Sequence, residues 1–183
     1  MSTLKVNNLT DLGADAVVTN GVIAASALPA GSILQVLSAH KSDTFSTASA
    51  TFVDVTGLSV TITPTSASSK ILLVGNVETG GPAASTAQSM VRLIRDATPI
   101  NIGDAAGSRA QSSSETNQFS TSGGMSVSLN YLDSPATTSA VTYKVQYRVS
   151  AGATVYINRT GADSDGATDS RMASNFTVME VAG

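Results

Sequence analysis

One cluster of carboxylates in the sequence could bind a cation. Asp163, Asp165 and Asp169 fall within seven residues of each other, around a glycine at position 166. Carboxylate oxygens in a glycine-bearing loop are typical of the start of a calcium loop. The bidentate glutamate expected at the twelfth position is missing, because Ser174 stands there. Aspartate and glycine are also ordinary turn residues, so a solvated loop is favoured and the three aspartates are weak metal candidates.

Other patterns that could support catalysis do not define an active site. His40 is the only histidine and has no recognisable Ser or Asp partner. Residues 103–108 have the glycine spacing of a phosphate loop but lack its Lys-Ser/Thr ending. A carbohydrate-active enzyme needs paired carboxylates, and Asp133 with Glu180 or Asp54 is the pair that this hypothesis would use. Nothing in their spacing recommends them, so we predict no enzymatic activity, no catalytic residue and no cofactor.

Composition excludes several classes of function. Only 13% of the 183 residues are charged and the net charge is -3, whereas about 25% charged residues is usual. A nucleic-acid binder needs clustered Lys and Arg, which this sequence lacks. Cysteine is absent, which excludes disulfides and thiolate metal sites. No stretch of about 20 mostly apolar residues occurs, so we expect no membrane insertion.

Alternation of apolar and polar residues predicts an all-β protein. Residues 141–149 place Val and Tyr at every second position, which is typical of a strand with one buried face. The stretches 125–131 and 58–62 alternate in the same way. Residues 70–75 are apolar on both faces, which predicts a strand that is covered on both sides. Further strands are expected at residues 32–38, 51–55, 70–77, 89–95, 154–159 and 175–181.

About eight or nine short strands with turn signals between them favour a sandwich or barrel. We predict an antiparallel jelly-roll-like β-sandwich over residues 31–183, with an extended N-terminal arm over residues 1–30. The arm lacks the apolar periodicity of a core, so we expect it to order against a partner. Aromatic residues make up only 4% of the chain. Such a thin core leads us to expect that contacts with other subunits finish the apolar strand faces.

Two arginines and one tyrosine are candidate interface residues. Arg92 and Arg95 have Asp96 and Asp104 nearby, and the planar fork of arginine is favoured at interfaces. The two arginines fall on opposite faces if their strand is regular, and a wet strand face is the alternative interpretation. Tyr156 faces away from its apolar neighbours, and an exposed tyrosine suits contact with sugar or protein.

Several phrases of the sequence resemble one group of proteins. Residues 2–9, Ser-Thr-Leu-Lys-Val-Asn-Asn-Leu, resemble the start of predicted tail-fibre and other virion proteins of marine bacteriophages, especially those that infect cyanobacteria. The junction Leu-Pro-Ala-Gly-Ser-Ile-Leu-Gln-Val-Leu at residues 28–37 is similar to the joint that leads into their globular heads. The chain also resembles proteins of this group at residues 52–64, 133–138, 142–146 and 177–183.

The resemblance implies a virion component, assembled in the host cytoplasm. It implies a homotrimer whose arm attaches to other virion proteins and whose head faces outward, where its loops at 79–88, 105–124 and 161–174 would meet a host surface glycan or protein. The candidate attachment residues are apolar side chains of the arm: Leu4, Val6, Leu9, Leu12, Val17 and Val18.

Two virion roles and one enzymatic role stay open at this point. Only about thirty residues precede the head, which leaves no room for a long fibre shaft. We therefore expect a short tail-fibre or receptor-binding component. The first alternative is a capsid decoration (cement) protein that stabilises the head, and the second is a carbohydrate-active enzyme.

Overall fold

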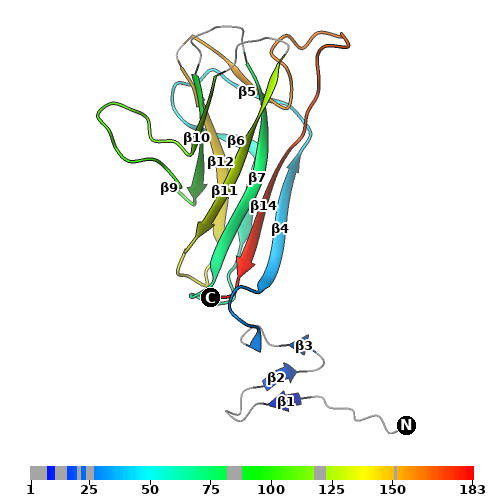
Figure 1. Cartoon of the computed structure of the whole chain (residues 1–183), viewed down its shortest axis with the longest axis vertical. Helices are drawn as coiled ribbons and strands as arrows, with labels where there is room; N and C mark the ends of the chain where they lie inside the picture. The colour runs from blue at the N-terminus through cyan, green and yellow to red at the C-terminus, as the bar shows by residue number, and fades with distance from the viewer. Residues whose placement is uncertain are drawn as a thin grey trace.

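The computed structural model describes residues 8–10, 16–19, 22–23, 27–81, 88–117, 123–150 and 152–183. All named elements in this part of the chain are β-strands (Figure 1). No helix among these residues is long and apolar enough to cross a membrane. The all-β class predicted from the alternation is therefore confirmed.

Eight strands form two antiparallel sheets that pack face to face (Figure 1). The first sheet has the order β4 (Ile33–Lys41), β14 (Ser174–Val181), β7 (Lys70–Gly80) and β11 (Gly124–Asp133). The second sheet has the order β6 (Val53–Ile62), β12 (Val141–Val149), β8 (Gln88–Arg95) and β10 (Ser114–Asn117). Counted along the chain from β4, these orders are 1-8-3-6 and 2-7-4-5, which is the arrangement of a jelly roll. The predicted jelly-roll-like sandwich is confirmed.

Three short strands complete the sheets. In the first sheet β13 (Val155–Ile157) pairs with β7 and with β5 (Phe45–Thr47), and in the second sheet β9 (Thr98–Ile100) pairs with β8. The sequence did not predict β5, β9 or β10, because three or four residues are too few to show a period of two. The predicted strands at 141–149 and 154–159 do not pair with each other, because β12 and β13 belong to different sheets.

The hydrophobic core lies between the two sheets. Every second residue of β12 is buried, as its alternation predicted. Tyr143 and Tyr147 of β12 and Phe176 of β14 are the largest fully buried side chains. Each such side chain stabilises the fold by roughly 1.5–3 kcal/mol relative to an exposed one. Most of the remaining core residues are Val, Leu and Ile: Val55, Leu58, Ile62, Ile71, Leu73, Val77, Val91, Leu93, Val127, Leu129, Val141, Val145, Val149, Val155, Ile157 and Val178.

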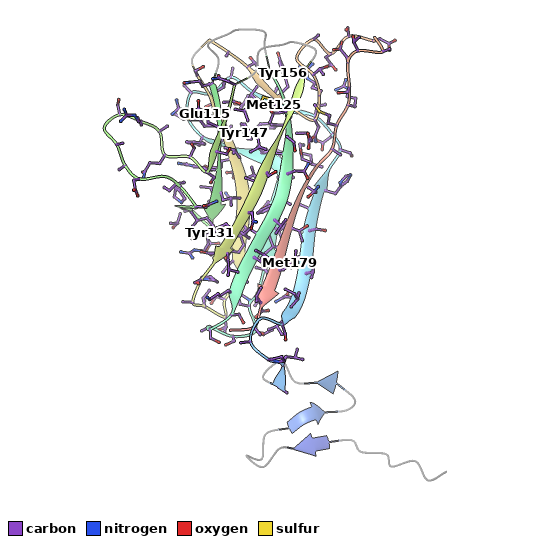
Figure 2. All side chains as sticks on the ribbon, in the orientation of Figure 1. Glu115, Met125, Tyr131, Tyr147, Tyr156 and Met179 are labelled. Carbon is purple, nitrogen blue, oxygen red and sulfur yellow. The ribbon has the colours of Figure 1, made fainter. Side chains whose placement is uncertain are left out.

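The outer face of the first sheet is open, which corrects the prediction that residues 70–75 are covered on both sides. Val74 is 37% exposed on this face. One cross-strand row runs over all four strands, because Met179 lies opposite both Val36 and Leu72, and Leu72 lies opposite Leu132. Val36 is 56% and Leu132 is 47% exposed. We call these four residues the apolar row, and Figure 2 shows Met179 toward the end of the sandwich where the arm begins.

The arm extends beyond the sandwich at the end where the C terminus lies (Figure 1). It contains the strands β1 (Asn8–Thr10), β2 (Ala16–Thr19) and β3 (Val22–Ile23), which form a small antiparallel sheet of their own. Of the candidate attachment residues, Leu9 in β1 pairs with Val18 in β2, and Val17 is also in β2. Leu4, Val6 and Leu12 lie outside the described residues.

A bulge joins two predicted strands into one. Two separate strands were expected at residues 51–55 and 58–62. Residues 53–55 and 58–62 both belong to β6, and residues 51–52 precede it. The pairing of β6 with β12 shifts between Lys144, opposite Ser59, and Gln146, opposite Asp54. Gly57 lies in the bulge with a φ of +89°, a conformation that strongly favours glycine.

Replacing this glycine tests the bulge. We expect Gly57→Ala to lower the free energy of unfolding by about 1–2 kcal/mol, because the new Cβ makes the backbone conformation unfavourable. Steric overlap does not contribute, since the nearest atoms, in the side chain of Lys41, would be 3.7 Å away. The matched control is Gly103→Ala, which has open space around it and should change stability by less than about 0.5 kcal/mol. Equal effects of the two substitutions in urea unfolding would contradict this account of the bulge.

Candidate functional site

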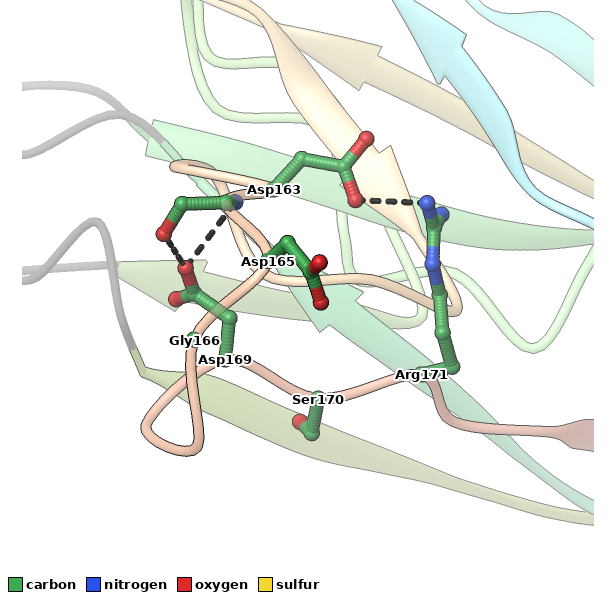
Figure 3. A pocket seen from close by; sticks show the side chains of 7 residues that line it. Asp163, Asp165, Gly166, Asp169, Ser170 and Arg171 are labelled. Atoms are coloured by element: carbon green, nitrogen blue, oxygen red, sulfur yellow. Dashed lines mark hydrogen bonds and ion pairs between the residues drawn. The ribbon is translucent and has the colours of Figure 1, made fainter.

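Asp163 lies between two arginines in the connection from β13 to β14 (Figure 3). Its Oδ2 is 2.8 Å from Nη1 of Arg159, and its Oδ1 is 2.7 Å from Nη2 of Arg171. Arg159 and Arg171 also form an isolated backbone bridge, which holds the two ends of the loop together. The carboxylate therefore bridges two guanidinium groups at the base of the loop.

Asp169 closes the same loop through neutral donors. It accepts hydrogen bonds from the backbone N–H of Ser164 at 3.0 Å, from the hydroxyl of Ser164, and from Oγ1 of Thr160 at 3.1 Å. The pKa of Asp169 is lowered, chiefly by the hydrogen bond from the Ser164 hydroxyl, and desolvation opposes this effect. A shallow hollow of about 280 Å³ lies in this loop, and it is lined by Asp163, Asp165 and Asp169 (Figure 3).

These contacts give the three aspartates a structural explanation. A cation that used both Asp163 and Asp169 would first have to displace two guanidinium groups and two serine or threonine hydroxyls. Within the described ranges, no group of three or more His, Cys, Asp or Glu side chains is arranged to hold a metal ion. The arrangement defines the shape of an exposed polar loop.

The two candidate interface arginines occupy opposite faces of β8, as the regular strand predicted. Arg95 points between the sheets, where its Nη1 is 3.0 Å from both carboxylate oxygens of Asp133. Asp133 also accepts a 2.7 Å hydrogen bond from the hydroxyl of Tyr143. Burial, and then the bond to Asp133, raises the pKa of Tyr143. Arg95, Asp133 and Tyr143 together join both sheets and leave Arg95 engaged within its own chain.

Arg92 lies on the outer face of the second sheet. Its guanidinium carbon is 4.1 Å from the centre of the Phe52 ring, and its Nε donates a 2.9 Å hydrogen bond to Gln146. Tyr156, the third candidate, is half-buried because the guanidinium of Arg159 stacks over its ring at 3.8 Å. The expected exposure of this tyrosine is therefore only partial.

The carboxylates proposed for a carbohydrate-active enzyme do not meet in one cleft. Asp133 and Glu180 both lie opposite Ile71 in the first sheet, and all three are buried between the sheets. Two strand spacings separate their backbones by about 9–10 Å. Asp54 is on the outer face of the second sheet, where it contacts Lys144 at 2.7 Å and Gln146 at 2.6 Å.

Glu180 is a buried carboxylate that is held by neutral donors. It accepts hydrogen bonds from Nε2 of Gln35 at 2.6 Å and from the N–H and hydroxyl of Thr65, both at 2.7 Å. Burial alone would raise its pKa, but these bonds outweigh burial and lower it. The bonds connect β4, β14 and the loop after β6, so Glu180 fastens one end of the sandwich.

The sequence did not predict one group of polar residues on the outer face of the second sheet. Cross-strand register places Glu115, Met90 and Arg148 in one row over β10, β8 and β12. Phe52 extends this row, since the guanidinium of Arg148 lies 5.8 Å from its ring. The alternation in 141–149 indicated that Arg148 is on a wet face. Glu115 could not be placed beside it because β10 was not recognised.

Glu180 makes stability depend on pH in a defined direction. Because its folded pKa lies below the ordinary value of 4.5, its stabilising effect is complete above that value and is lost as the pH falls through the folded pKa. We expect Glu180→Gln to lower the free energy of unfolding at neutral pH by roughly 1–3 kcal/mol. The difference from wild type should shrink on acidification in urea titrations at several pH values. Asp104→Asn, on the exposed loop 101–113, is the control, and a difference for E180Q that is the same at every pH would contradict the prediction.

Comparison with known proteins does not add a family to this description. No protein-family model matches the chain, and no curated protein matches it.

Proposed function

We propose that this protein is a structural component of a bacteriophage virion, namely a short tail-fibre or receptor-binding component. The proposal starts from the phrases at residues 2–9 and 28–37 that resemble phage virion proteins. In this role the arm docks on other virion proteins, three copies of the head associate, and the loops meet the host surface.

The observation that carries the proposal is the placement of the arm and the connection between β13 and β14 at opposite ends of an elongated sandwich (Figure 1). The arm and the C terminus share one end. The long connection between β13 and β14, residues 158–173, lies at the other end. A protein that links a particle to an external target needs its two contact regions to be separated in this way. Residues 82–87, within another loop proposed to meet the host, lie outside the described residues.

The apolar row supports association between copies. Its four side chains cross the whole outer face of the first sheet near the arm. The next row, formed by Ser38, Thr177, Val74 and Asn130, contains no charged side chain. Association through these two rows would remove apolar area from water, while Lys70 and Glu78, the charged residues of β7 on this face, lie in other rows. The low charge of the whole chain is consistent with repeated packing against copies of itself.

Immunogold labelling of phage particles that carry this protein tests the proposal. We expect antibodies against the head domain to label the tail. Label on the capsid would instead favour the decoration protein, and the absence of label from intact particles would contradict both virion roles.

Deletion of residues 1–30 is the matched functional experiment. For a fibre, the truncated protein should still bind host cells but should fail to join the tail, because the arm supplies the attachment. The full chain serves as the control in both measurements. Loss of capsid binding together with more fragile heads would identify the decoration role, and cleavage of a polysaccharide by the head would identify an enzyme.

A further inference from the structure

The six arginines of this chain divide into two groups by their partners. Arg95, Arg159 and Arg171 each form an ion pair with an aspartate. The other three arginines make no ion pair within the described part of the chain, and all three gather at the second sheet: Arg92, Arg109 and Arg148. The nearby segments 82–87 and 118–122 contain no Asp or Glu in their sequence, so they cannot provide the missing carboxylates.

A groove of about 480 Å³ lies between the outer face of the second sheet and the loop from β9 to β10. Met90 of β8 forms its floor, with Arg148 of β12 on one side and Glu115 of β10 on the other. Figure 2 shows Glu115 on β10. Residues 108–110 of the loop, including Arg109, form the remaining wall, and Gln88 lines one end. The volume is typical of a pocket for a small ligand.

The groove has an excess of positive charge. Of the residues that line it, Arg109 and Arg148 contribute two positive charges and Glu115 contributes one negative charge, which gives 2 - 1 = +1 in a chain whose net charge is -3. Lys144 does not add to this excess, because it is paired with Asp54 at 2.7 Å.

Arg148 has donors that the protein leaves unused. Its Nε is buried and has no hydrogen-bond partner among the described residues. Its guanidinium carbon is 5.8 Å from the centre of the Phe52 ring, which Arg92 approaches more closely at 4.1 Å. The ring therefore holds both guanidinium groups against the sheet. A buried N–H without an acceptor has a free-energy cost. An anionic ligand that accepted a hydrogen bond from Nε of Arg148 would remove this cost.

We propose that this groove binds an acidic sugar residue, that is, a sugar ring that carries one carboxylate. The planar guanidinium groups of Arg148 and Arg109 match a carboxylate, and the apolar floor of Met90 suits the C–H face of a ring. Glu115 lies two strands from Arg148, about 9–10 Å along the row, where it accepts hydrogen bonds from sugar hydroxyls. Its own charge disfavours a ligand with a second anionic group at that end.

The proposal names the ligand of the receptor-binding role and so rests on the proposed function. An acidic polysaccharide on the host surface would present such residues repeatedly. Each copy in an assembly would then offer one groove, which increases the overall affinity without any new contact.

Isothermal titration of the full chain with an oligogalacturonate tests the groove directly. We expect binding that weakens with salt, and no binding of the carboxyl-reduced neutral oligosaccharide. Arg148→Gln and Arg109→Gln should each reduce affinity roughly tenfold or more, since each removes a charged hydrogen bond. Lys144→Gln is the control and should bind like the wild type, because Lys144 lies on the same sheet but is ion-paired with Asp54 and does not line the groove.

Sodium acetate and sodium sulfate separate a sugar site from a general anion site. Binding of either salt as tightly as the oligogalacturonate would overturn the proposal. The proposal would also be overturned if both R148Q and R109Q still bound the oligogalacturonate, or if the wild-type chain did not bind it. Thermal unfolding checks that R148Q is folded, and R109Q carries the test if it is not, because Arg109 is exposed on a loop.

This result can be separated from the proposed function. No oligogalacturonate binding together with immunogold label on the tail would remove the acidic-sugar ligand and retain the fibre. Arginine-dependent binding together with label on the capsid would retain the groove and remove the tail location.

Discussion

The packing of the two sheets through one layer of Val, Leu, Ile and Tyr side chains is the interaction on which the rest of the structure depends. This layer uses one face of every principal strand and fixes the register of each. The opposite faces are then determined by the same alternation. In the first sheet the outer face carries the apolar row from Val36 to Leu132, and its charged residues Lys70 and Glu78 lie in other rows. In the second sheet the outer face carries charged side chains, including Arg92 and Arg148.

Three groups of charged residues have separate roles. Asp133 and Glu180 fasten the interior near one end, through Arg95, Tyr143, Gln35 and Thr65. The Asp163 loop uses its carboxylates to hold a connection in shape at the other end. The arginines around Met90 have neither role, because no ion pair engages them. Because of this contrast, we propose self-association for the outer face of the first sheet and ligand binding for the outer face of the second sheet.

The alternating strands were predictable because each is eight or more residues long and half-buried. The bulge at Gly57 was not, since two short alternating runs look separate until their shared partner β12 is known. The groove escaped prediction for a related reason. Its residues Met90, Glu115 and Arg148 come from three strands that are distant in sequence, and Ser114–Asn117 is too short and polar to be recognised as a strand. The three aspartates at 163–169 were visible in sequence, but the arginine partners of Asp163 and the Ser and Thr partners of Asp169 depend on how the loop folds.

The central claim is that the apolar row on the first sheet packs against other copies, while the groove on the second sheet remains open for a ligand. Hydroxyl-radical footprinting of the full chain measures both faces at once, because Met179 lies in the middle of the apolar row and Met90 on the floor of the groove. At assembly concentrations the account predicts protection of Met179 and free oxidation of Met90, and then protection of Met90 when oligogalacturonate is added. Free oxidation of Met179 at all concentrations, or protection of Met90 before any ligand is present, would contradict it.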